Sequence, residues 1–300
     1  MYAKNDPRAS LAAAASGPVR TGLIAEPQVG DFERSPPTED RDGVKSWHIR
    51  GANSVLVWSR CAPGATLVRT GQVDEYVAIL PAARADIRAG ADRAVTDPNT
   101  IAMIPPGASA ITLPDGGDVC RLFTTRSADM LALCPNAGAY DAPRTHIPPF
   151  APWSEPAGGL KLRTYSIDVP AQEGRFGRIF RCTTFMVNML YPSDGPRDTT
   201  KMSPHHHDDF EQFSLAISGG YDHHMRWPWT TDMADWRPDR TITVGAPSVC
   251  VIPPPVIHTS RASDAGTNQL VDIFCPPRAD FSAKPGWVLN ADDYPAPEGV

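Results

Sequence analysis

The chain has 300 residues, enough for two domains or one large one. Its 28 basic and 34 acidic residues give a formal net charge of −6, and these charges are spread along the chain. That balance excludes a basic nucleic-acid-binding surface and an electrostatic attraction to anionic membranes. The 32 prolines exclude long helices, because each proline removes a backbone donor and clashes with the preceding helical turn.

The six cysteines are widely spaced and form no C-x-x-C pair, which predicts reduced, mostly buried thiols. The apolar run near the N-terminus is too short for a signal peptide, and no stretch reaches the length of a membrane span. We therefore expect a cytoplasmic protein whose partner is a small-molecule substrate, with no nucleic acid and no membrane. A homodimer stays open.

Residues 1–43 are rich in Ala, Pro, Asp and Glu and show little periodicity. They predict an N-terminal arm that either drapes over the body or is disordered. Beyond the arm, short runs of β-forming residues alternate with Pro, Gly and Asp, and one short helix is expected near 231–236. This spacing predicts an all-β barrel or sandwich. The runs are 54–58, 76–80, 101–104, 183–187, 213–217 and 270–274.

The second half of the chain repeats the first. Residues 101–110 (IAMIPPGASA) align with 249–258 (VCVIPPPVIH), and residues 122–129 (LFTTRSAD) align with 273–280 (IFCPPRAD). Two similar offsets in the same order indicate a duplicated domain. We place the boundary near residue 150, in a proline-rich stretch, which gives the arm at 1–43 and two halves at 44–150 and 151–300.

Six of the eight histidines lie between residues 205 and 258. In an extended strand, His205, His207 and Glu211 share one face, which continues through the apolar residues of 213–217. If that apolar face points into a barrel, two imidazoles and a carboxylate are buried there, which costs on the order of several kcal/mol without a partner. A divalent transition metal removes that cost. His258 follows a rigid proline turn and is the candidate fourth ligand.

These residues resemble the two motifs of the cupin superfamily. The first motif, H-x-H-x3-E followed by glycine, matches 205–211, with Gly219 one place later than usual. The second, P-x-G-x-x-H, matches 253–258, with Pro255 in place of glycine. The resemblance implies a bicupin, with two cupin-type β-barrels (double-stranded β-helix, or jelly-roll) in tandem. It also implies four metal ligands in the C-terminal barrel: His205, His207, Glu211 and His258.

The first half has lost these ligands in the same alignment. Glu75 stands at the position of Glu211, but Arg69 and Gly71 replace the two histidines of the first motif, and Ala110 replaces His258. One carboxylate is not a metal site. We expect the N-terminal barrel to support the C-terminal one, and the alternative is a vestigial ligand pocket.

Other residues near the motifs are candidates for catalysis. If the strand keeps its phase past Gly219-Gly220, Tyr221 and His223 face the barrel lumen and serve as proton-transfer or hydrogen-bonding groups. A bulge at the two glycines would instead leave His223 on the surface. Arg261 would pair a substrate carboxylate or cap a strand edge. The Trp- and Arg-rich segment 226–237 would form an aromatic wall or pack against the other half.

The expected cofactor is one divalent transition metal, with Fe(II) favoured and Mn, Ni, Zn, Co and Cu left open. The resemblance to bicupin dioxygenases favours an iron(II)-dependent dioxygenase whose substrate, a small organic acid, phenol or diketone, chelates the metal. One alternative is a redox-silent isomerase, lyase or decarboxylase, in which His223 or Tyr221 moves a proton. Another is a non-enzymatic small-molecule-binding protein.

Overall fold

A computed structural model describes residues 24–142 and 144–299, so most of the expected arm lies outside the described residues. Strands dominate both halves, and the only α-helices among the described residues are two short ones, which confirms the all-β prediction. The elements up to residue 142 are β1 (Gln28–Asp31), β2 (Glu39–Arg41), β3 (Val44–Arg50), β4 (Ser54–Cys61), β5 (Thr66–Gln72), β6 (Tyr76–Leu80), β7 (Ala85–Ala89), β8 (Asp92–Thr96), β9 (Thr100–Ile104), β10 (Gly107–Thr112), β11 (Gly117–Thr124), α1 (Ala128–Ala132) and the 3-10 helix η3 (Ala137–Tyr140). Those after it are β12 (Arg163–Ser166), β13 (Gly177–Arg181), β14 (Met186–Leu190), β15 (Ser193–Asp194), β16 (Gln212–Ser218), β17 (Gly220–Arg226), the 3-10 helix η4 (Met233–Asp235), β18 (Arg240–Gly245), β19 (Ser248–Ile252), β20 (Ile257–Ala262), β21 (Thr267–Phe274) and α2 (Ala279–Ser282).

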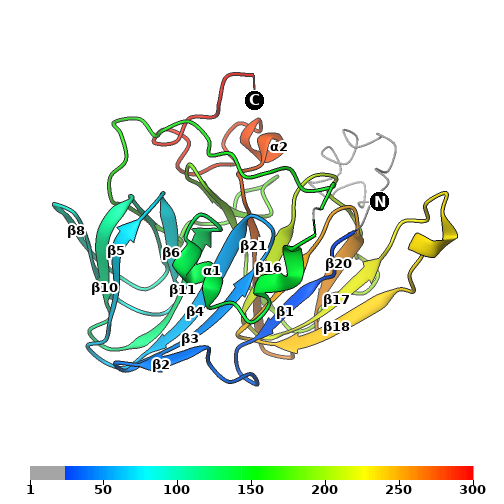
Figure 1. Cartoon of the computed structure of the whole chain (residues 1–300), viewed down its shortest axis with the longest axis horizontal. Coiled ribbons are helices and arrows are strands. Elements are labelled where there is room, and N and C mark those ends of the chain that lie inside the picture. Colours follow the sequence, from blue (N-terminus) through cyan, green and yellow to red (C-terminus); the bar gives the residue numbers. More distant parts are fainter. Residues whose placement is uncertain (1–23, 143, 300) are drawn as a thin grey trace.

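The two halves have the same sheet topology. The order β9-β6-β11-β4-β3 in the large sheet of the first half recurs as β19-β16-β21-β14-β13 in the second, with antiparallel pairing throughout. A small sheet completes each barrel: β5-β10-β7-β8 in the first half and β18-β17-β20 in the second. Figure 1 shows the small sheets at opposite ends of the molecule with the large sheets between them. The repeated sequence segments occupy equivalent strands, as a duplication predicts.

Each half lends one strand to the other. β1 pairs with β19 and extends the large sheet of the second half, while β12 pairs with β9 and extends that of the first. Residues 28–31 of the expected arm are therefore part of a sheet. β12 follows the expected boundary at residue 150 yet belongs to the first half's sheet, so the sheets do not divide where the sequence pattern does.

The largest hydrophobic core lies between the two large sheets. It joins residues of the first half, such as Trp58 and Ile79, to residues of the second, such as Phe213 and Leu215. The sequence-based expectation that the apolar face of 213–217 lines the barrel lumen is therefore wrong. That face packs against the other half, because packing the two large sheets against each other removes the apolar surface of both from water. The alternating, more polar residues of β16 point into the lumen instead.

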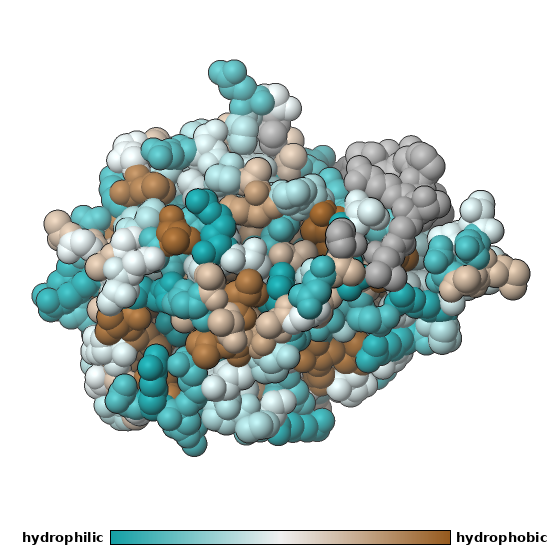
Figure 2. Space-filling view, in the orientation of Figure 1, coloured by the Kyte–Doolittle hydropathy of each residue, from teal (hydrophilic) through white to brown (hydrophobic). Residues whose placement is uncertain are grey.

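The hairpin between β17 and β18 extends beyond the body of the molecule, at the right of Figures 1 and 2. At its base, Trp227 is buried and Arg237 forms an ion pair with Glu26. At its tip, Trp229 and Trp236 stack with ring centroids 4.8 Å apart, and Trp229 is 77% exposed. The segment 226–237 thus packs on the arm and extends into solvent, and it lines no wall of the site below. The 3-10 helix η4 stands where a short helix was expected.

The six cysteines are all buried free thiols, as their spacing predicts. Among the described residues, no helix has the length and apolar character needed to cross a membrane.

Candidate metal centre

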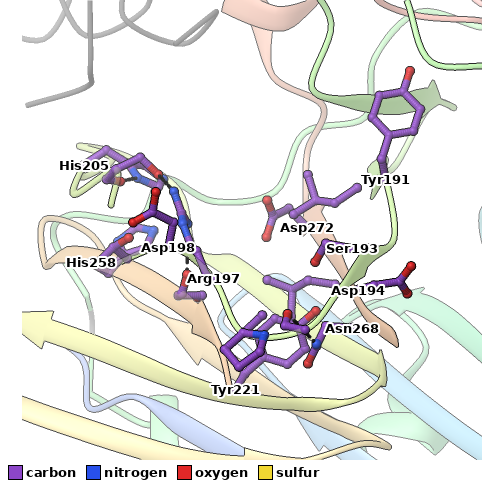
Figure 3. A pocket seen from close by; sticks show the side chains of 18 of the residues that line it. Tyr191, Ser193, Asp194, Arg197, Asp198, His205, Tyr221, His258, Asn268 and Asp272 are labelled. Carbon is purple, nitrogen blue, oxygen red and sulfur yellow. Dashed lines mark hydrogen bonds between the residues drawn. The ribbon is translucent and has the colours of Figure 1, made fainter. Parts of the chain in front are cut away.

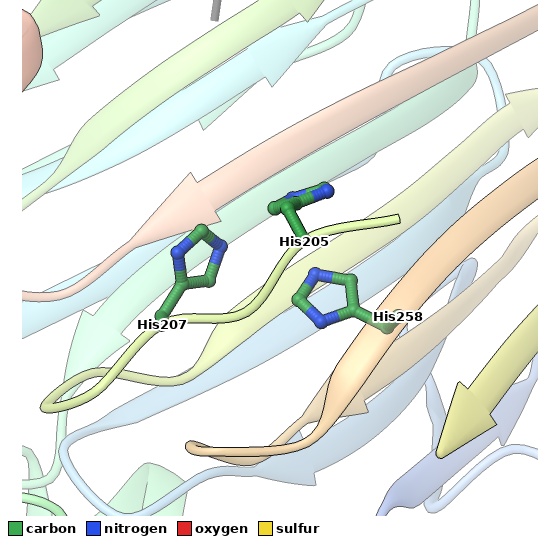
Figure 4. Close-up of side chains that lie close together, drawn as sticks. All are labelled: His205, His207 and His258. Atoms are coloured by element: carbon green, nitrogen blue, oxygen red, sulfur yellow. The ribbon is translucent and has the colours of Figure 1, made fainter. Parts of the chain in front are cut away.

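His205 and His258 are held side by side by their own backbones. The N–H of His205 donates to the carbonyl of His258 (3.0 Å), and the N–H of His258 donates to the carbonyl of His205 (2.7 Å). His207 lies two residues further on, so its side chain returns to the same side (Figure 4). One ring nitrogen from each of the three histidines lies within 4.8 Å of the others. The structure therefore brings together three of the four expected ligands.

Hydrogen bonds to the backbone fix the tautomers of two of these rings. His205 Nδ1 donates to the carbonyl of Ser203 and His258 Nδ1 donates to the carbonyl of Val256, each at 2.9 Å. Because a carbonyl oxygen only accepts, Nδ1 carries the proton and Nε2 carries the lone pair of each neutral ring. Three imidazoles with oriented lone pairs are a donor set that fits a divalent transition metal.

His207 is neutral because it is buried. Burial lowers the pKa of His207 well below its ordinary value, and the ring stacks under Phe210 with centroids 4.4 Å apart. His207 Nε2 donates to Gln212 Oε1 at 2.9 Å. The amide of Gln212 is oriented in turn, because its Nε2 donates to Ser214 Oγ (2.9 Å) and to Asp272 Oδ1 (3.0 Å). Asp272, Gln212 and His207 thus form a chain of hydrogen bonds that orients one ring of the histidine triad.

Glu211 does not join the three histidines, which corrects the expected ligand set. Its carboxylate accepts hydrogen bonds from the backbone N–H of Ala52 (2.6 Å) and from the hydroxyl of Tyr140, both in the first half. Burial raises the pKa of Glu211 to about 7 despite these donors. Strand alternation explains why Glu211 is not a ligand. Its side chain lies on the same face as that of Phe213 and points to the first half, whereas the side chain of Gln212 lies on the opposite face, near the histidines.

The spacing of Gly219 was the sequence signal for this correction. Counted from Glu211, Gly219 comes one residue later than the motif expects; counted from Gln212, the spacing is regular. Gln212 therefore occupies the position of the motif's glutamate. The candidate metal centre has a neutral amide where the cupin motif has a carboxylate.

Glu75 makes the same kind of contact in the opposite direction. Its carboxylate accepts from the N–H and the hydroxyl of Thr183, each at 2.9 Å, and from the hydroxyl of Tyr294. Thr183 lies in the β13–β14 turn, as Ala52 lies in the β3–β4 turn. Each buried glutamate thus joins its own half to a hairpin of the other half. The correspondence between Glu75 and Glu211 reflects this reciprocal contact, which we call the glutamate clamp.

The tyrosines of the glutamate clamp belong to a repeat that the sequence analysis missed. The motif N-A-x-x-Y occurs at 136–140 and again at 290–294. In each copy, the asparagine side chain bonds both the N–H and the C=O of one strand-end residue: Arg50 in β3 and Arg181 in β13. The asparagine anchors the motif, and the tyrosine four residues later reaches the glutamate of the other half.

Tyr221 and His223 are both buried, but the strand does not keep its phase: Gln212 lines the lumen before the two glycines and Tyr221 lines it after them, across a register shift between Ala216 and Ser218. His223 Nδ1 lies 2.8 Å from Ser260 Oγ, while its Nε2 has no hydrogen-bond partner among the described residues. Burial lowers the pKa of His223 to about 4, and the nearby His258 contributes in the same direction. His223 is therefore a neutral ring inside the same barrel as the three histidines, and the irregularity in the strand does not leave it on the surface.

Arg261 is not brought to the metal centre. Its guanidinium pairs with the carboxylate of Asp222, with Nε 3.0 Å from Oδ2, and Asp222 also accepts from Thr243 Oγ1 at 2.6 Å. Arg261 lies three residues after His258 on β20, and an odd separation places two side chains on opposite faces of a strand. The expected pairing of Arg261 with a substrate carboxylate is therefore wrong in this structure.

A cavity of about 420 Å³ opens beside the histidines, and we call it the metal-site pocket. His205 and His258 form one side, and Gln212, Tyr221 and Asp272 line it further in. Figure 3 shows the carboxylate of Asp272 extending into this space toward the side that carries the histidines. Asp272 was not predicted from the sequence, because no motif marks it. It aligns with Arg121 of the first half.

The lumen of the first half holds guanidinium groups in the corresponding place. Arg69 pairs with Asp129, and Arg121 is only 5% exposed. The guanidinium carbons of the two arginines lie 5.2 and 5.6 Å from the ring centroid of Phe123. Gly71 and Ala110 offer no ligand atom. The histidine triad is the only group of three or more metal-binding side chains found among the described residues.

No family model matches the sequence, and no curated protein matches it in sequence. Solved structures are similar in fold. AerE from Microcystis aeruginosa matches at 9% identity and a TM-score of 0.55, over 85% of this chain and 99% of that one. An oxalate decarboxylase from Lactobacillus farciminis matches at 14% identity and 0.57, over 87% and 89%. An oxalate decarboxylase variant from B. subtilis matches at 14% and 0.58, over 91% and 82%. Likeness at these identities shows the fold alone: this chain has the fold of a bicupin, with two cupin barrels in tandem.

Proposed function

We propose that this chain is a mononuclear metal-dependent enzyme whose divalent metal is held by His205, His207 and His258. One observation carries the proposal: three imidazoles from two separate segments converge, and two of them, those of His205 and His258, line a pocket of about 420 Å³. Three protein ligands leave coordination positions for a substrate. When bound, the metal would supply Lewis-acid or redox chemistry to a substrate that chelates it.

The chain's own residues orient and surround the substrate. Gln212 and Asp272 hold His207 in place through their hydrogen bonds, and the ring of Phe210 stacks on that of His207. Burial, with the negative charge of Asp272, raises the pKa of Tyr221, so its phenol stays protonated and is able to donate a hydrogen bond to a substrate. These groups give the pocket both a donor and an acceptor next to the metal ligands.

An iron(II)-dependent dioxygenase is the finer form of this proposal. A set of three imidazoles leaves room for a substrate that chelates through two oxygens and for a further small ligand. The substrate would be a small organic acid, phenol or diketone. Three nitrogen ligands bind several first-row metals, so the metal itself decides whether dioxygen takes part.

A redox-silent lyase, isomerase or decarboxylase is the second candidate. Asp272 and Tyr221 favour it, because an acceptor and a donor on one wall can move a proton without any change of oxidation state. The fold similarity to oxalate decarboxylases is compatible with this chemistry and does not select it.

Metal exchange separates these candidates. The protein is stripped with a chelator, reloaded without oxygen with Fe(II), Mn(II), Co(II), Ni(II), Cu(II) or Zn(II), and given hydroxy acids, phenols and diketones. Turnover that needs Fe(II) and consumes oxygen supports the dioxygenase. Turnover without oxygen, with more than one metal, supports the lyase or isomerase.

Two further outcomes contradict the proposal. Bound metal with no turnover of any compound would favour the non-enzymatic binding protein. Failure to bind any of the six metals would remove the metal centre itself. His207→Ala, measured beside the wild type, shows which turnover depends on the centre.

A further inference from the structure

One ring of the histidine triad belongs to a stack of three side chains. The rings of His207 and Phe210 are stacked with centroids 4.4 Å apart and an interplanar angle of 27°. The guanidinium carbon of Arg278 lies over the same phenylalanine ring, 4.6 Å from its centroid. We call these three side chains the His-Phe-Arg stack. Phe210 therefore contacts both the imidazole and the guanidinium.

Arg278 is a rigid support for this stack. It is only 9% exposed, and its Nε donates to Asp280 Oδ1 at 2.9 Å while its Nη2 donates to the other oxygen of the same carboxylate. Its guanidinium carbon also lies 4.0 Å from the ring centroid of Phe281 and 4.9 Å from that of Phe274. A planar guanidinium that is paired through two hydrogen bonds and enclosed by aromatic rings has few other positions to occupy.

Two kinds of contact restrain the ring of His207. The hydrogen bond to Gln212 Oε1 fixes one ring nitrogen but leaves the imidazole able to turn about that bond. The face contact with Phe210 fixes the plane of the ring, together with an edge contact from Phe274 at 5.9 Å and 88°. A metal ligand needs both restraints, because its lone pair must meet those of the other two imidazoles.

The first half holds a guanidinium on the same kind of support but in a different place. An aspartate and a phenylalanine align between the halves, Asp129 with Asp280 and Phe123 with Phe274. In the first half this pair holds Arg69, which stands at the position of a motif histidine in the lumen. In the second half it holds Arg278, which comes from the segment between β21 and α2. The histidine positions of the second half are therefore left to the imidazoles, and the guanidinium contacts Phe210 instead.

We propose that Phe210 and Arg278 are positioning residues of the metal centre, which hold the ring of His207 in the orientation that binds the ion. Neither is a ligand itself, because a phenyl ring has no donor atom and a guanidinium stays protonated. Their effect on the metal therefore passes through His207. This inference rests on the proposed metal-dependent function.

The test measures cobalt binding by metal-free wild type, Phe210→Leu, Phe210→Tyr and Arg278→Lys. A competing chelator gives the dissociation constant, and the visible spectrum is recorded at saturating cobalt. Leucine keeps an apolar side chain but removes the flat ring, whereas tyrosine keeps the ring. Phe210 lines a cavity of about 410 Å³, which leaves room for the added hydroxyl. The matched control is Phe123→Leu, which removes a buried ring that contacts guanidinium groups in the first half.

We expect Phe210→Leu to raise the dissociation constant of cobalt about tenfold and Arg278→Lys to raise it severalfold. The visible spectrum of the bound cobalt should also change in Phe210→Leu, because His207 then meets the ion at a different angle. This change at full occupancy separates lost orientation from lost stability. Phe210→Tyr and Phe123→Leu should keep the wild-type spectrum and a dissociation constant within about twofold of wild type. Arg278→Lys serves alone if the leucine variant does not fold.

Three results would overturn the inference. Wild-type affinity and spectrum in both Phe210→Leu and Arg278→Lys would remove the positioning role and leave the metal centre in place. A loss of affinity in Phe210→Tyr as large as that in Phe210→Leu would show that the ring plane is not what matters. Absence of cobalt from the wild type would remove the proposed function, and the inference with it.

Discussion

In the second half of the molecule the barrel lumen holds three imidazoles and Asp272; in the first, the same region holds Arg69 and Arg121. The large sheets around both lumens have the same strand order, and the same glutamate clamp crosses between the halves in each direction. The contacts between the halves have therefore stayed alike while the lumens have diverged.

The difference follows from strand alternation. On each large sheet, one face is committed to the apolar core between the halves, where a change of volume or polarity is costly. The other face lines the lumen, where side chains can change without disturbing that core. One face of the duplicated sheet thus keeps the two halves packed together, and the other face holds the lumen side chains that differ between the halves.

The largest expected effect is on metal binding, because the histidine triad of the second half has no counterpart among the described residues of the first half. His207→Ala should lose its bound metal, because two imidazoles are too few ligands to retain it. Its far-ultraviolet circular dichroism should stay that of the wild type, because the rest of the barrel is unchanged. Metal analysis after dialysis measures this. His48→Ala removes a buried histidine of the first half and should keep one metal per chain. Full occupancy in His207→Ala would show that the ligands are assigned wrongly.

The glutamate clamp should matter equally to both halves. Glu75→Ala and Glu211→Ala each leave a buried tyrosine hydroxyl and a backbone N–H without an acceptor, so each should lower the free energy of unfolding by about 3 kcal/mol. Urea denaturation measures this, with the exposed Glu33→Ala as a control that changes little. Neither clamp variant should lose metal. If Glu211→Ala alone loses metal, the two glutamates are not equivalent and Glu211 is a ligand after all.

The clamp also predicts a pH dependence from Glu211. Its pKa is about 7 in the folded protein against an ordinary 4.5, so the folded state binds more protons between these values. The contribution of Glu211 to stability is therefore fully present below pH 4.5 and is lost as the pH rises through 7, by up to about 3 kcal/mol. Glu211→Gln cannot titrate. The difference in unfolding free energy between wild type and this variant should shift in favour of the variant from pH 5 to pH 8, and a constant difference would refute the assignment.

The smallest effect concerns the guanidinium of the first lumen. Arg121 donates one long hydrogen bond, to Ser59 Oγ at 3.4 Å, and its Nε has no partner among the described residues. Replacing a buried, poorly compensated charge with an apolar side chain of similar size is often neutral or stabilising. Arg121→Met should raise the free energy of unfolding by about 1 kcal/mol, and the exposed Arg34→Met should leave it unchanged. A clear loss of stability in Arg121→Met would show that this charge has a stabilising partner.

The sequence predicted the fold and part of the site because both rest on local patterns. Short runs between prolines and glycines indicate strands, and the aligned segments 101–110 and 249–258 indicate the duplication. The H-x-H pair could be found because two residues separated by one lie on the same face of a strand. His258 could be found because it directly follows a rigid proline turn.

The rest depended on which face of a sheet meets the other half. The apolar run 213–217 shows only that one face is buried, and it is buried against the first half rather than in the lumen. Assigning the apolar face to the lumen placed Glu211 among the ligands by mistake. For the same reason Gln212 and Asp272 were not predicted to line the lumen. Arg261 was misplaced for a related reason, since proximity to His258 in sequence does not decide the face on which a side chain lies.

The most direct test of the central claim is a crystal structure of the cobalt-loaded protein with anomalous diffraction measured at the cobalt edge. We expect one peak per chain, about 2.1 Å from a ring nitrogen of His205, of His207 and of His258, with the carboxylate of Glu211 still hydrogen-bonded to Ala52 and Tyr140. A peak bound by Glu211, or no peak beside the three rings, would contradict it.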